Sequence, residues 1–112
     1  MIDATLMASI LDSLKDPLLF ADTDHVIRYI NKAAIAHYEE GETLLGRSVL
    51  DCHSGKSQEM IVEILAAMQA GEEERLITDN EEQRIYMRAV HSADGQLLGY
   101  YERYEPPVNQ GD

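Results

Sequence analysis

The stretch DCHSGKS at residues 51–57 places several reactive side chains close together in the sequence. Cys52 and His53 are potential metal ligands, and the closing Gly-Lys-Ser matches the end of a phosphate-binding loop. Such a loop needs another glycine five residues before Gly55, so that backbone N–H groups can surround the phosphates. That position is Leu50, and no predicted strand leads into the stretch. The sequence therefore argues against a nucleotide phosphate loop.

A zinc site and nucleophilic catalysis are also disfavoured in this stretch. The side chains of neighbouring residues such as Cys52 and His53 point apart, and the other histidines are scattered singly, so four ligands are not expected to converge. Cys52 or Ser57 as a nucleophile would need an oriented base, and the spacing supplies none. We therefore expect no enzyme. The simplest interpretation is a helix start, capped by Ser54 or Ser57, with Cys52 as a small buried side chain.

Length and charge limit the class of protein further. A chain of 112 residues suits a single domain. Its 9 Lys and Arg against 21 Asp and Glu give a net charge of -12, which repels nucleic acid and anionic membrane surfaces. No apolar run approaches the ~20 residues that cross a bilayer, and the N-terminus lacks the basic segment of a signal peptide. With a single cysteine, this composition predicts a cytoplasmic protein that binds neither nucleic acid nor membrane.

Hydrophobic patterning predicts an α+β domain over residues 1–105, followed by a flexible tail at 106–112. Asn31 is expected to cap a short helix, Gly71 to end the longest helix, and Asp94-Gly95 to form a hairpin turn. The resulting order implies a five-stranded antiparallel sheet with helices on one face. The predicted elements are a helix at 1–14, a hairpin of strands at 17–21 and 26–30, a helix at 32–38, an irregular crossing at 43–53, a helix at 57–70, and strands at 74–78, 84–91 and 97–104.

This order of elements, together with three segments of sequence, resembles a PAS domain. The segments are DPLLFADTDHVIRYINKAA, LLGRSV and ADGQLLGYYERYE, and the resemblance covers about residues 9–105. It implies a five-stranded sheet and a helical flank that enclose a ligand pocket, or that serve as a signalling and dimerisation module. GRSVLDCH, followed by KS and a long helix, is similar to PAS domains found beside hemerythrin-like domains and to haem-bearing PAS domains of carbon-monoxide-sensing regulators.

In those haem-bearing domains, a histidine at the position of His53 is an iron ligand. The resemblance therefore implies b-type haem as the cofactor, with His53 as the metal ligand and a gas or a redox state as the signal. Alternation along residues 84–91 places Met87 on the face that would line the haem, as a candidate sixth ligand. Lys56 with Ser57, or Arg88, are the expected partners of the haem propionates, because a buried carboxylate needs a cation or hydrogen bond.

A ligand-free module that only dimerises is the alternative. The apolar residues Ile2, Leu6, Ile10 and Leu14 recur at steps of four, and this stripe suits either a cap on the core or a dimer seam. In the alternative, a homodimer forms through this helix and the outer face of the sheet. The sequence leaves both interpretations open.

Overall fold

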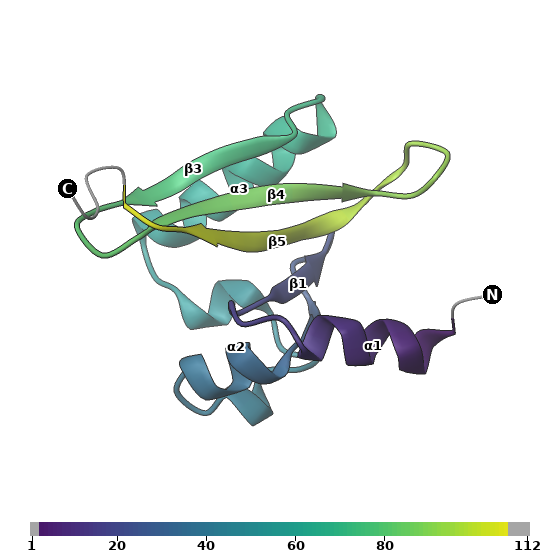
Figure 1. Cartoon of the computed structure of the whole chain (residues 1–112). Coiled ribbons are helices and arrows are strands. Elements are labelled where there is room, and N and C mark those ends of the chain that lie inside the picture. The colour runs from purple at the N-terminus through teal and green to yellow at the C-terminus, as the bar shows by residue number, and fades with distance from the viewer. Residues whose placement is uncertain (1–2, 108–112) are drawn as a thin grey trace.

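The computed structural model describes residues 3–107, which form a five-stranded sheet flanked by helices (Figure 1). All neighbouring strands pair antiparallel, in the order β2-β1-β5-β4-β3. The predicted α+β class, the antiparallel sheet and the N-terminal helix are therefore confirmed. The elements are α1 (Ala4–Asp12), β1 (Leu19–Asp22), β2 (Ile27–Ile30), α2 (Lys32–His37), the 3₁₀ turns η1 (Gly41–Thr43) and η2 (Val49–Cys52), α3 (Lys56–Gln69), β3 (Glu74–Asp79), β4 (Arg84–His91) and β5 (Leu97–Glu105).

The register between β4 and β5 decides which side chains share a face of the sheet. Ile85 lies opposite Tyr104, Met87 opposite Glu102, and Ala89 opposite Tyr100. In a strand, successive side chains point to opposite faces, so these three pairs lie on one face. We call this the inner face, because Ile85, Met87, Ala89 and Tyr100 are buried on it and three of them belong to the hydrophobic core. The predicted alternation along β4 is confirmed.

Helix α3 contributes four apolar side chains to the same core. Ile61, Ile64, Leu65 and Met68 are all buried, as their helical spacing predicts. The start of the helix differs from the expectation. Its N-cap residue is Gly55, at a φ of +54°, and no side chain caps it. The prediction that Ser54 or Ser57 caps this helix is therefore wrong, because the chain turns into the helix through a glycine at a positive φ.

Asn31 is a fully buried polar residue whose hydrogen bonds connect several segments. Its side-chain oxygen accepts from the backbone N–H of Ala34, which is the predicted cap of α2, and also from Leu18. Its amide nitrogen donates to the carbonyls of Leu11 and Asp16. Since a buried amide is costly when it is unpaired, these four bonds fix the N-terminal segment against the start of β1 and α2.

Helix α1 lies at the edge of the molecule (Figure 1). It is shorter than predicted, because it ends at Asp12, and Met1 and Ile2 lie outside the described residues. None of its residues is buried, although the Tyr29 hydroxyl donates to the carbonyl of Ala8. The tail predicted at 106–112 lies, beyond Pro107, outside the described residues. Within residues 3–107, no helix has the length and apolar character needed to cross a membrane.

Candidate functional site

A cavity of about 490 Å³ opens between the inner face of the sheet, the start of α3 and the segment around η2. This volume is within the range of pockets that hold small molecules and cofactors. The apolar part of its lining consists of Leu19, Leu44, Val49, Met60, Ile61, Ile77, Ile85 and Met87. The polar part consists of His37, Tyr38, Cys52, His53, Ser57, Thr78, Tyr100, Glu102 and Tyr104.

Three of the predicted site residues line this cavity. His53 is exposed and directly follows η2, where extended backbone leads toward α3. Ser57 is in the first turn of α3, and its side chain is also exposed. Met87 is at the centre of β4 and is only 2% exposed. The tertiary structure therefore brings a solvent-accessible imidazole and a buried thioether to one cavity. Cys52 also lines it and is exposed, so the expectation of a buried cysteine is wrong.

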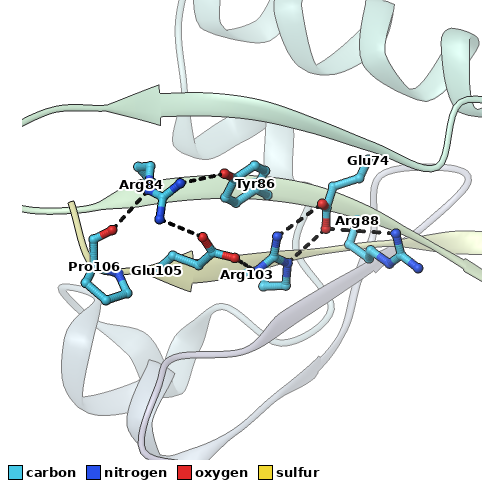
Figure 2. Close-up of polar contacts among 7 residues, drawn as sticks. All are labelled: Glu74, Arg84, Tyr86, Arg88, Arg103, Glu105 and Pro106. Atoms are coloured by element: carbon cyan, nitrogen blue, oxygen red, sulfur yellow. Dashed lines mark hydrogen bonds and ion pairs between the residues drawn. The ribbon is translucent and has the colours of Figure 1, made fainter. Parts of the chain in front are cut away.

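The other two predicted residues do not line the cavity. Arg88 points to the outer face of the sheet, where its guanidinium lies 4.0 Å from the Glu74 carboxylate (Figure 2). The assignment of Arg88 to a haem propionate in the cavity is therefore wrong, because strand alternation turns it to the opposite side from Met87. Lys56 is exposed at the first position of α3, next to Ser57.

Sequence reasoning missed Glu102, which lies on the inner face of β5. Its neighbours on that face are Tyr100 and Tyr104, and Met87 is its partner on β4. The sequence carried a signal for it. Alternation along YYERYE places Tyr100, Glu102 and Tyr104 on one face of the strand. A carboxylate between two tyrosines on the buried face is an unusual polar group.

Burial sets the ionisation of the groups around Glu102. Glu102 is half-buried, and burial is the one cause that raises the pKa of its carboxyl. Burial also raises the pKa of Tyr38 and of Tyr100, and the nearby Glu102 carboxylate adds to both shifts. These phenols therefore remain neutral at ordinary pH. The Tyr38 and Tyr104 hydroxyls are hydrogen-bonded at 3.0 Å, and Tyr100 Oη lies 2.8 Å from His25 Nδ1.

A comparison against protein families agrees with the fold. A family profile described as PAS domain matches residues 7–105. The chain belongs to the PAS domain family, whose members are sensor modules typical of signal-transduction proteins. Comparison with curated protein sequences gave no match.

Solved structures with the same fold include proteins of several bacteria. A C-terminal domain from Streptococcus mutans aligns with a TM-score of 0.76 at 18% identity, over 96% of this chain and 87% of that one. The PAS domain of BvgS from Bordetella pertussis aligns with a TM-score of 0.68 at 15% identity, over 95% and 87%. The Aer2 receptor from Vibrio cholerae, a dual PAS-heme oxygen sensor, aligns with a TM-score of 0.54 at 14% identity, over 79% and 90%. At these identities the likeness establishes the fold alone.

Proposed function

We propose that this PAS domain is a non-enzymatic sensor module that binds a small ligand in the inner-face cavity, with b-type haem as the leading candidate. The observation that carries the proposal is that His53 and Met87 line the same cavity, although they come from the segment before α3 and from β4. Imidazole and thioether are both axial ligands of haem iron in proteins. Bound haem would supply an iron centre that takes up a gas or changes its redox state.

The residues that line the cavity meet the main requirements for binding haem. Although polar residues contribute to its lining, most of the surface that faces the cavity is apolar, which suits a flat apolar macrocycle. His53 and Met87 would hold the iron, and the Ser57 hydroxyl offers a hydrogen bond at the cavity. Lys56, exposed beside Ser57, is the remaining proposed cation for a propionate, and a solvated lysine has the reach and charge for that contact.

Titration of the purified domain with ferric haem, followed by its Soret absorbance, tests the proposal. Wild type is expected to bind with a shifted Soret band, and His53→Ala to bind at least about tenfold more weakly, because the metal loses a protein ligand. Met87→Leu should retain haem with an altered spectrum. His91→Ala is the matched control, because His91 is exposed at the end of β4 and does not line the cavity. A His53→Ala protein with wild-type affinity and Soret position would refute the assignment.

A second candidate function is dimerisation with another copy of this chain through α1. One observation favours it: the apolar stripe along this segment is exposed, with Leu6 at 49%, Met7 at 53%, Ile10 at 51% and Leu14 at 43%. Exposed apolar surface of this kind is typical of an interaction face. The outer face of β3, β4 and β5 is a weaker candidate for the seam, because it carries the charged network of Figure 2.

Sedimentation of concentrated protein tests dimerisation. Ile10→Glu places a charge in the stripe and should weaken self-association by at least about tenfold, since a buried unpaired charge is costly. Thr5→Glu adds the same charge to α1 beside the stripe and should leave the association unchanged. A wild type that is monomeric at high concentration would rule out a dimer through α1.

A further inference from the structure

Glu102 is the most unusual polar group of the cavity. It is held in the middle of β5, between Tyr100 and Tyr104, and is paired across the sheet with the buried Met87. Strands β1 and β4 flank β5 on its two sides, so the position of Glu102 is fixed by the centre of the sheet. A carboxylate placed here by a rigid element is well suited to recognise one group of a ligand.

Within residues 3–107, no side chain around the cavity pairs with this carboxylate. Neither Lys nor Arg is among the described residues that line the cavity, and no hydrogen bond lowers the pKa of Glu102. The nearby phenols have other partners, because Tyr38 bonds to Tyr104 and Tyr100 bonds to His25. No buried side-chain oxygen or nitrogen within residues 3–107 is both fully enclosed and unbonded, so the Glu102 oxygens have access to the cavity.

An unpaired carboxyl group in such a place is unfavourable unless something bound there satisfies it. The neighbours of Glu102 on the inner face are Met87, Tyr100 and Tyr104, which are apolar or phenolic, so a water-filled cavity compensates this group only in part. A ligand that donates a hydrogen bond or presents a positive charge to Glu102 would bind more tightly than one that does not. At a pH where Glu102 is ionised, a ligand with a carboxylate at the same point would be repelled, and neither Lys nor Arg among the described lining residues would offset the repulsion.

We propose that Glu102 determines the specificity of the cavity. It selects ligands that have an apolar body and present an ammonium, N–H or O–H donor to β5, and it rejects ligands that present a carboxylate there. The inference rests on the proposed function only in that the cavity must take up a small ligand. It does not require the ligand to be haem.

Three small aromatic probes of matched shape test the inference: benzylamine, benzyl alcohol and benzoate. Binding is followed by NMR through the methyl groups of Met87 and Ile85, so that attachment elsewhere on the acidic surface is not counted. At pH 8, where the cost of the charged Glu102 is expected to appear, wild type should bind benzylamine about tenfold more tightly than benzoate, with benzyl alcohol between them. Glu102→Gln should reduce this ratio to near one. Glu81→Gln removes a charge from the exposed β3–β4 turn and should leave the ratio unchanged.

The outcomes separate this inference from the proposed function. Equal affinity of wild type for benzylamine and benzoate would overturn it, as would an unchanged preference in a folded Glu102→Gln or Glu102→Leu protein. If wild type binds ferric haem in a His53-dependent way but shows no preference among the probes, only the inference fails. If it prefers benzylamine but does not bind haem, the inference stands and the haem proposal fails. Binding of neither haem nor any probe overturns both.

Discussion

The two faces of the β3–β4–β5 part of the sheet differ in how their charged side chains are paired. On the outer face, Arg103 donates from Nε to Glu74 at 2.8 Å and also bonds to Glu105, and Arg84 Nη2 lies 2.9 Å from Glu105 (Figure 2). On the inner face, Glu102 has no such partner among the residues that the structure describes.

The two glutamates consequently shift in opposite directions. The Arg103 guanidinium holds the pKa of Glu74 below its usual range, whereas burial raises the pKa of Glu102. Paired charges at a wet surface are common and contribute little to stability, so the outer network needs no functional explanation. An unpaired carboxyl in a cavity costs stability, and this cost points to a role in binding.

The largest predicted difference between the faces is in packing. Ile85 is buried on the inner face of β4, and its replacement by alanine should reduce the free energy of unfolding by about 2–3 kcal/mol. Leu76 lies on the outer face of β3, opposite Tyr86, and is 43% exposed. Leu76→Ala should change stability by no more than about 0.5 kcal/mol. Urea unfolding of both variants measures the difference, and similar losses would contradict the assignment of the faces.

Glu102→Gln should stabilise the domain at alkaline pH, by about 1 kcal/mol at pH 8. Because burial raises the folded-state pKa of Glu102 above its ordinary value of 4.5, the folded state retains this proton more strongly than the unfolded state does. The contribution of the protonated Glu102 carboxyl to the free energy of unfolding is fully present below pH 4.5 and is lost as the pH rises through the folded-state pKa. Urea unfolding from pH 5 to pH 8.5 should show a gap between variant and wild type that widens with pH. A gap that is constant with pH, or that Glu81→Gln reproduces, would contradict the interpretation.

Arg103→Met should have the smallest effect, a loss of about 0.5–1 kcal/mol at low salt. The Arg103 guanidinium also lies 4.3 Å from the centre of the Tyr86 ring, a stacking contact that the variant loses as well. Glu74 has a folded-state pKa below its ordinary value of 4.5, so its stabilising contribution is present above pH 4.5 and is lost as the pH falls through the folded-state pKa. The loss should therefore shrink in acid and in 1 M NaCl. Arg47→Met, at an exposed position away from this network, is the control, and an Arg103→Met loss that is insensitive to salt would count against the ionic origin.

Local patterns in the sequence determined most of the fold. Helical spacing identified the buried face of α3, Asn31 identified the cap of α2, and Asp94-Gly95 identified the turn before β5, where Gly95 has a φ of +89°. Each of these depends on residues within one or two turns of chain, which interact whatever the rest of the molecule does. The cap of α3 is an exception. The serines near its start predicted a side-chain hydrogen bond to the backbone, but the helix begins at Gly55 with a positive φ and no side chain caps it.

The cavity was decided by the tertiary structure. The sequence named His53, Ser57 and Met87 as site residues, but only the packing of α3 on the sheet places them around one space. The sequence could not show that Glu102 lies beside Met87, because this contact depends on the register between β4 and β5. A shift of one residue would have turned Glu102 outward and Arg103 inward, and burial of the apolar partners on the inner face fixes which alternative forms. Local sequence thus sets the elements, whereas long-range pairing sets which side chains meet in the cavity.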